Sequence, residues 1–115
     1  IQRFITILFD FPEFFHENAR IQILNGTNKY GIAAQLGTKM IPYGFNIEHY
    51  DNADKKNYET THFYIHNPSN TRVTEEVIRL FLPKVLKMRN DPPADTDTDY
   101  DISIVIGNDL DLKDL

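Results

Sequence analysis

Residues 21–24 alternate apolar and polar side chains, the period of a half-buried β-strand. This strand is expected to stop at Asn25-Gly26, because that pair is typical of tight turns. A helix should follow, with Thr27 or Asn28 as its N-cap. Its apolar side chains recur every four positions, which predicts one buried helix face made by Ile32, Leu36 and Met40.

The rest of the chain predicts three more strands and a second helix. Strands are expected at residues 45–50, 61–66 and 102–106, and a helix should start near Thr71 and end or kink at Pro83. Residues 102–106 are apolar on both faces, which is the mark of an interior strand. In the strand at residues 45–50, alternation places Phe45, Ile47 and His49 on one face. In the strand at residues 61–66, it places Thr61, Phe63 and Ile65 on one face and His62, Tyr64 and His66 on the other.

The remaining segments give weaker patterns. Residues 85–88 are expected to form an irregular turn, and residues 91–101 a loop of Pro, Asp and Thr with no reason to pack. Residues 1–18 form a Phe-rich lead-in, helix or strand, which starts within an apolar stretch and reads as cut from a longer protein. The expected domain covers residues 19–110, and residues 111–115 form a tail.

The order strand, helix, strand, strand, helix, strand predicts an α+β fold. We expect a two-layer sandwich with a βαββαβ, ferredoxin-like arrangement, in which two helices cover one face of a four-stranded sheet. A ferredoxin-like order places the last strand at an edge, so its two apolar faces need a cover, which residues 1–18 could supply.

Composition narrows the possible functions. The 115 residues include no cysteine, so disulfides, thiolate metal sites and a Cys nucleophile are excluded. No run approaches the roughly 18 consecutive apolar residues that span a membrane. The net charge is −5, and residues 91–115 hold eight Asp against one Lys. An acidic chain without a Lys/Arg cluster repels phosphate backbones, which argues against nucleic acid as a partner.

Two patterns could bind a ligand. The turn at residues 25–31 joins a strand to a helix and could offer amide groups to an anion, although a plain turn with a cap is the favoured interpretation. His62 and His66 share a strand face with Tyr64, but their Cα atoms lie roughly 13 Å apart, too far for one metal. His49 on a neighbouring strand could at best complete a two-ligand site. Exposed histidines that flank a tyrosine suit stacking on a sugar or docking a partner.

Patterns for catalysis are missing from the sequence. Residues 95–101 read D-x-D-x-D-x-D, but they lack the Gly and Glu of a calcium loop and are interpreted as a solvated linker. The chain has no G-x-S-x-G, and its Asp residues give no preferred acid/base pair. We therefore expect no catalytic residues, no metal ligands and no cofactor.

Several short motifs in one order resemble the LytR C-terminal domain family. They span residues 20–110 and comprise IQILNGT (21–27), GIA (31–33), YGFNI (43–47), DNA (51–53), Tyr58, Thr61 with Phe63, and IVIGND (104–109). The resemblance implies an accessory module of bacterial cell-envelope proteins, usually attached to an extracytoplasmic LytR/CpsA/Psr domain that transfers glycopolymers. The transferase residues belong to that other domain.

The resemblance and the residues together predict a noncatalytic binding domain. It is expected on the extracytoplasmic side, tethered to the membrane only through a part outside this chain, and in contact with cell-wall polymer or another envelope protein. The turns after the first and last strands could rim a shallow site if those strands are parallel. A protein-docking scaffold is the alternative, and a metal-dependent hydrolase is the weakest hypothesis. The candidate binding residues are Asn25, Gly26, Thr27, Asn28, His62, Tyr64, His66, Asn108 and Asp109.

Overall fold

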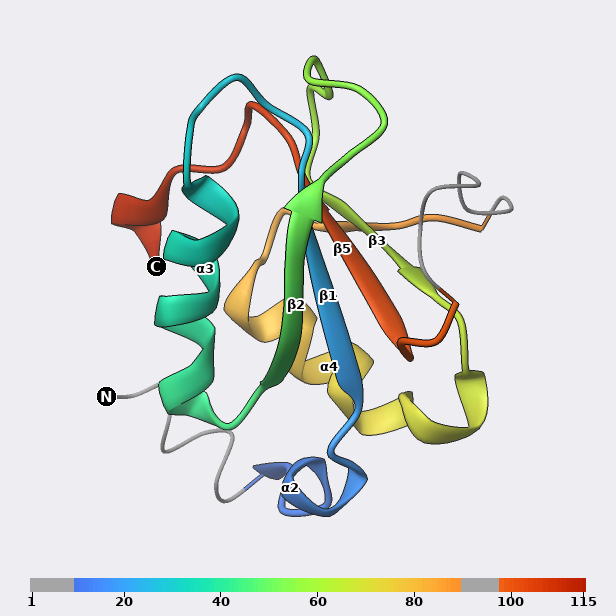
Figure 1. The fold of residues 1–115 in the computed structure, drawn as a ribbon. Coiled ribbons are helices and arrows are strands. Elements are labelled where there is room, and N and C mark those ends of the chain that lie inside the picture. The colour runs from blue at the N-terminus through green and yellow to red at the C-terminus, as the bar shows by residue number, and fades with distance from the viewer. Residues whose placement is uncertain (1–9, 90–97) are drawn as a thin grey trace.

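The computed structural model describes residues 10–89 and 98–115 (Figure 1). Their elements are, in chain order, α2 (Phe14–Glu17), β1 (Arg20–Asn25), α3 (Ile32–Met40), η1 (Ile41–Tyr43), β2 (Asn46–Asn52), β3 (His62–Ile65), η2 (Pro68–Asn70), α4 (Arg72–Phe81), β4 (Leu86–Lys87), β5 (Ile102–Ile106) and η3 (Leu112–Asp114). Within this part of the chain, no helix has the length and apolar character that crossing a bilayer requires.

The strands form one mixed sheet in the order β2-β1-β5-β3-β4. β1 is parallel to both β2 and β5, and β3 is antiparallel to β5 and parallel to β4. The last long strand therefore lies inside the sheet, as its two apolar faces predict. The expected ferredoxin-like order is not confirmed, because that order puts the last strand at an edge. The expected count of four strands is also wrong, since β4 adds a fifth.

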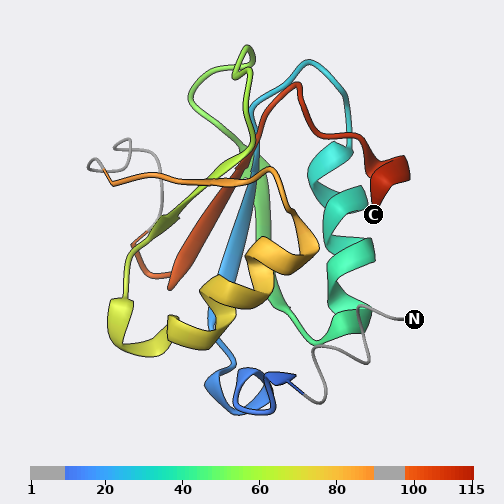
Figure 2. The same ribbon diagram turned by 180° about the vertical axis from the view of Figure 1, so that it is seen from behind.

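Both longer helices pack with the same face of the central strands. One cluster of buried side chains contains Ile32, Leu36 and Met40 of α3 together with Val77, Ile78 and Phe81 of α4. The same cluster includes alternate residues of three strands: Ile21, Ile23, Ile102, Ile104, Ile106 and Phe63. Figure 2 shows α4 in front of the strands and α3 beside it. The predicted stripe of α3 and the predicted alternation of β3 are both confirmed.

The opposite face of the sheet is also buried, by a smaller cluster. It holds Leu24, Tyr64 and Val105, against which Ala53, Tyr58 and Met88 pack. Tyr58 comes from the loop between β2 and β3, and Met88 follows β4. This cover explains why β5, with both faces shielded from water, consists almost entirely of branched apolar residues.

The limits of α3 and α4 have different structural causes. α3 begins at Ile32 rather than directly after Thr27, because Asn25, Thr27 and Lys29 form a hydrogen-bonded turn first. α4 starts after Thr71 and ends at Phe81, two residues before Pro83, as predicted. Its first N–H groups are satisfied by a distant carboxylate.

That carboxylate belongs to Glu17 of α2. Its two oxygens accept hydrogen bonds from the backbone N–H groups of Val73 and Thr74, at 3.0 and 2.7 Å. Phe14 of the same short helix is buried against Phe45. Residues 14–17 thus hold the start of α4 and cover one end of the core. The expected cover of the last strand by residues 1–18 falls partly on residues 1–9, which lie outside the described residues.

A β-bulge in β2 changes which side chains share a face. Ile47 pairs with Ile21 but His49 pairs with Gln22, so the register shifts between them. The prediction that Ile47 and His49 share a face is therefore wrong. His49 lies on the face opposite the helices, and Tyr50, the partner of Ile23, lies on the helical face, where its ring sits close to Gly37.

Two segments expected to be irregular are ordered by hydrogen bonds. Residues 86–87 form β4 instead of a turn, with Leu86 N–H donating to Thr61 and Met88 N–H to Phe63. The part of the 91–101 loop that the structure describes also packs. Asp101 accepts hydrogen bonds from the backbone N–H of Arg20 and from the amides of Asn67 and Asn70. Residues 91–97 lie outside the described residues.

Candidate functional site

The turns after β1 and β5 lie side by side at the carboxyl end of the sheet, where both chain segments continue toward α3 and η3 (Figure 1). β1 and β5 are parallel, and Gly26 N–H donates to the carbonyl of Ile106 at 3.0 Å. A Cβ added to Gly26 would lie 2.6 Å from that carbonyl oxygen. Glycine is therefore required here by close approach of two strands, and the expected meeting of these turns is confirmed.

The Asn25 side chain organises the first turn. Its Oδ1 accepts from the N–H and the hydroxyl of Thr27, at 2.9 and 2.7 Å, and its Nδ2 donates to the carbonyl of Lys29 at 2.9 Å. Thr27 Oγ1 in turn accepts from Lys29 N–H at 3.1 Å. The amides of residues 26, 27 and 29 are thus engaged within the protein. This favours a structural turn over an anion cradle.

A second set of hydrogen bonds joins the loop before β3 to the segment after β5. Asp109 Oδ1 accepts from both the N–H and the hydroxyl of Thr61, each at 2.8 Å. The Thr61 hydroxyl also accepts from Gly107 N–H at 3.1 Å. Gly107 approaches the backbone of Thr60 so closely that an added Cβ would lie 2.3 Å from its carbonyl carbon. We refer to these contacts as the Thr61–Asp109 clasp.

The loop between β2 and β3 binds to both turns through its backbone. Ala53 N–H donates to Asn25, Tyr58 N–H to Gly26, and Asn108 N–H to Tyr58. Three loops are thereby fixed to one another at this edge. Of the residues that carried the family resemblance, Asn25, Gly26, Ala53, Tyr58 and Asn108 take part in these contacts.

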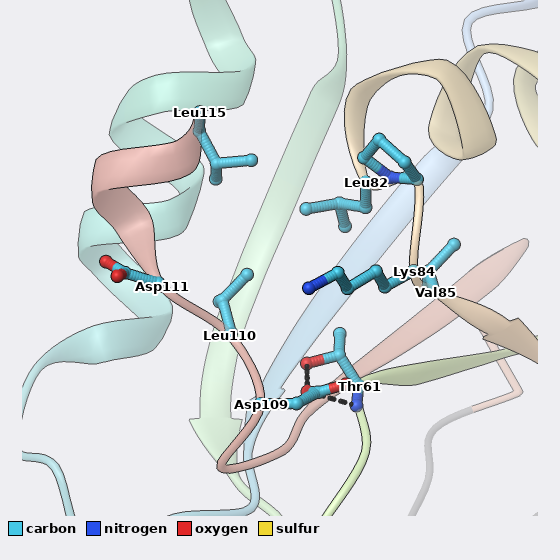
Figure 3. A pocket seen from close by; sticks show the side chains of 9 residues that line it. Thr61, Leu82, Lys84, Val85, Asp109, Leu110, Asp111 and Leu115 are labelled. Carbon is cyan, nitrogen blue, oxygen red and sulfur yellow. Dashed lines mark hydrogen bonds between the residues drawn. The ribbon is translucent and has the colours of Figure 1, made fainter.

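A pocket of about 250 Å³ lies on one side of the segment 109–111, between the end of α4 and η3 (Figure 3). Its walls are mostly apolar, and the Lys84 side chain extends across it toward Leu110. Asp109 faces Thr61 in the clasp, and Asp111 points away from the opening. The lining residues are Thr61, Leu82, Pro83, Lys84, Val85, Asp109, Leu110, Asp111 and Leu115.

A larger groove of about 460 Å³ lies on the other side of the same segment. Its lining mixes polar and apolar groups and combines residues of the first turn and α3 with residues that follow β5: Lys29, Tyr30, Ile32, Gln35, Asn108, Asp109, Leu110, Asp111, Leu112 and Lys113. Tyr30 is 99 % exposed. Tyr30 was not among the predicted residues, although an aromatic residue between Lys29 and Gly31, outside the apolar face of the helix, was the available signal.

The predicted candidate residues therefore divide into two groups. The carboxyl edge holds Asn25, Gly26, Thr27, Asn28, Asn108 and Asp109, and of these Asn108 and Asp109 line the groove. His62, Tyr64 and His66 lie on the sheet face opposite the helices. Binding by any of these residues stays a prediction.

The histidines do not form the exposed strip that the sequence predicts. His62 is 3 % exposed and Tyr64 is 6 % exposed. The His62 ring lies 5.0 Å from that of Tyr58, and its Nδ1 donates to the carbonyl of Thr60 at 2.9 Å. His66 is half-buried, with Nε2 2.8 Å from Ser103 Oγ. The expectation that these side chains are exposed is therefore wrong for His62 and Tyr64, because Tyr58 and Met88 pack over this face.

The idea that His49 lies on a strand next to His62 or His66 is also wrong. β1 and β5 separate β2 from β3, and strands are spaced about 4.8 Å apart, so the backbones of β2 and β3 are about 14 Å apart. His49 instead stacks on Tyr100. Within residues 10–89 and 98–115, no three His, Asp or Glu side chains are grouped so as to hold a metal ion.

Charged groups are paired at the opposite end of β1. Arg20 Nε donates to Glu48 at 2.8 Å, which raises the pKa of Arg20 and lowers that of Glu48. Burial works to raise the pKa of Asp101, but the hydrogen bonds from Arg20, Asn67 and Asn70, with the charge of Arg20, outweigh it, so the pKa lies below its usual value. Arg20, Glu48 and Asp101 thus stabilise the start of β1, at the end of the strand opposite to the groove.

The structure is that of a small mixed α/β domain. Hydrogen bonds fix the turns at its carboxyl edge, and open hollows lie beside these turns. A family model described as LytR cell envelope-related transcriptional attenuator matches residues 18–110. The chain therefore belongs to the LytR C-terminal domain family, which confirms the resemblance. Comparisons with curated proteins and with solved structures found no match. Members of this family are accessory, rather than catalytic, domains of cell-envelope proteins.

Proposed function

We propose that this chain is a noncatalytic binding domain of a bacterial cell-envelope protein and that its ligand is an envelope polymer. It acts on the extracytoplasmic side, held near the membrane by a part of the protein outside this chain. The observation that carries the proposal is the groove at the carboxyl edge, which is open and whose mixed lining includes amide, carboxylate and ammonium groups. Sugar hydroxyls both donate and accept hydrogen bonds, so such a lining suits a glycan.

The way in which the edge is built supports binding without catalysis. Asp109, the acidic residue best placed to act on a ligand, accepts two hydrogen bonds from Thr61 through one oxygen. This oxygen is therefore engaged within the protein, where it holds the turn after β5. The net charge of −5 disfavours nucleic acid as the polymer.

Sedimentation with purified peptidoglycan sacculi tests the proposal. We expect the chain to pellet with sacculi, and to remain bound at 0.3 M salt because the groove binds through hydrogen bonds and stacking. Polysaccharide-free membranes serve as the control. Absence of the chain from the pellet at every salt concentration, including low salt, would overturn polymer binding.

A protein-docking scaffold is a second candidate, and the apolar pocket is the observation that favours it. Leu82, Val85, Leu110 and Leu115 surround a space that an apolar side chain of a partner could fill. A photo-crosslinking residue in place of Lys84, in the full-length protein in its own cells, would test this. A discrete crosslinked protein supports docking, and crosslinks to polymer alone count against it. The metal-dependent hydrolase is not proposed, because the structure separates His49 from His62.

A further inference from the structure

The groove between the first turn and the segment after β5 carries an exposed aromatic ring at its rim and polar groups of both charges along its walls. We propose that this groove binds an uncharged stretch of glycan, with one sugar stacked on the ring of Tyr30. The inference rests on the proposed function and deepens it, since it names the site and the ligand class.

The exposure of Tyr30 is unusual within the described part of the chain. The ring is 99 % exposed, whereas the other exposed large apolar side chains there reach at most 51 %. Both faces of the ring are thus accessible to a ligand. The face of an aromatic ring carries partial negative charge and attracts the weakly positive C–H groups on the flat side of a sugar. A phenol also keeps its hydroxyl available at the edge for a hydrogen bond.

The backbone on both sides of Tyr30 is fixed before any ligand arrives. The carbonyl of Lys29 accepts from Asn25 and its N–H donates to Thr27, at 2.9 and 3.1 Å. Gly31 leads directly into α3, and its carbonyl accepts from Gln35 N–H at 3.1 Å. The Tyr30 backbone is therefore held from both sides, which reduces the entropy lost when a ligand binds.

The charges along the groove select the kind of glycan. Lys29 and Lys113 supply two cations, and Asp109 and Asp111 supply two anions, so these groups cancel. A polymer rich in phosphate would meet the two carboxylates without a cationic excess to offset them. The amides of Gln35 and Asn108 add neutral donors and acceptors. This set fits the hydroxyl and acetamido groups of a neutral sugar chain.

NMR titration of the ¹⁵N-labelled chain tests the inference with two probes, the β-1,4-linked hexamer of N-acetylglucosamine and poly(glycerol phosphate). We expect the hexamer to shift amide signals in residues 28–35 and 108–113 and to bind more tightly than the phosphate polymer. Tyr30→Ala should weaken binding about 5- to 10-fold, the loss of one aromatic contact. Tyr30→Phe should stay within about 2-fold, since the ring remains. Leu86→Ala, at an exposed position of the edge strand β4, away from the groove, should leave the affinity unchanged.

Three results would overturn the inference: equal binding by Tyr30→Ala and the original chain, tighter binding of poly(glycerol phosphate), or shifts confined to other residues. Sedimentation with sacculi separates this failure from failure of the proposed function. If sacculi retain the original chain and Tyr30→Ala equally, polymer binding stands and the groove is the wrong site. If sacculi retain neither while the hexamer binds in the groove, the groove stands and the polymer is a different one.

Discussion

The Thr61–Asp109 clasp predicts an unusual order of stability among substitutions of Thr61. Thr61 is 4 % exposed, and its hydroxyl both donates to Asp109 and accepts from Gly107 N–H. Thr61→Val keeps the shape but removes both hydrogen bonds and leaves a buried N–H without an acceptor. An unsatisfied buried group costs about 1–3 kcal/mol, and a hydrogen bond to a charged group contributes about 1.5–3 kcal/mol. We expect a loss of about 3 kcal/mol in the free energy of unfolding.

Thr61→Ser keeps the hydroxyl and loses only a methyl group, which costs about 1 kcal/mol. The more polar substitution should therefore be the milder one, the reverse of the order expected at an apolar core position. Urea unfolding followed by circular dichroism measures both. With an m-value of about 1–3 kcal/mol/M, the Thr61→Val midpoint falls by about 1–3 M.

Thr38→Val is the matched control. Thr38 is exposed on α3, and its hydroxyl donates only to the carbonyl of Ala34 within the helix. It should change stability by less than about 0.5 kcal/mol. In a double-mutant cycle, Asp109→Ala should cost less in the Thr61→Val background than in the original chain. Thr61→Val within 0.5 kcal/mol of the original chain, or less damaging than Thr61→Ser, would refute the reasoning.

Three further substitutions test other parts of the structure. Gly26→Ala should lower the free energy of unfolding by more than about 2 kcal/mol, because the added Cβ meets the backbone of Ile106. Thermal unfolding measures this loss, and an unchanged melting temperature would contradict the close approach. Glu17→Ala should cost about 1–2 kcal/mol by uncapping α4, with Glu13→Ala near neutral as control in urea unfolding. Asp101 has a lowered pKa when folded, so its stabilisation is present above its ordinary pKa of 3.8 and is lost as the pH falls below that value. Asp101→Asn should flatten this pH dependence in urea titrations between pH 2.5 and 5, and equal slopes would show that the contacts contribute nothing.

The sequence predicted the features that depend on the period of apolar residues. The stripe of α3, the two faces of β3 and the interior character of β5 all follow from which side chains must avoid water. The end of α4 at Phe81 follows from a local signal, Pro83 shortly after it. These features need no knowledge of distant residues.

The features that the sequence missed depend on partners far along the chain. β4 forms because Thr61 and Phe63 offer carbonyls to residues more than twenty positions away. The bulge that turns His49 to the opposite face depends on the register with β1. His62 and Tyr64 are buried because Tyr58 and Met88 fold over them. The groove was missed because it arises only where the first turn and the segment after β5 meet in space.

The central place of β5 has a consequence for synthesis of the protein on the ribosome. Ile21 pairs with Ile102, so the first strand waits for a partner that is translated 81 positions later. Until then the nascent chain can form only two separate pairs, β2 with β1 and β3 with β4, each with an unpaired edge. Folding of the domain is thus completed after translation of its last strand, and such open edges are where a chaperone protects an emerging chain.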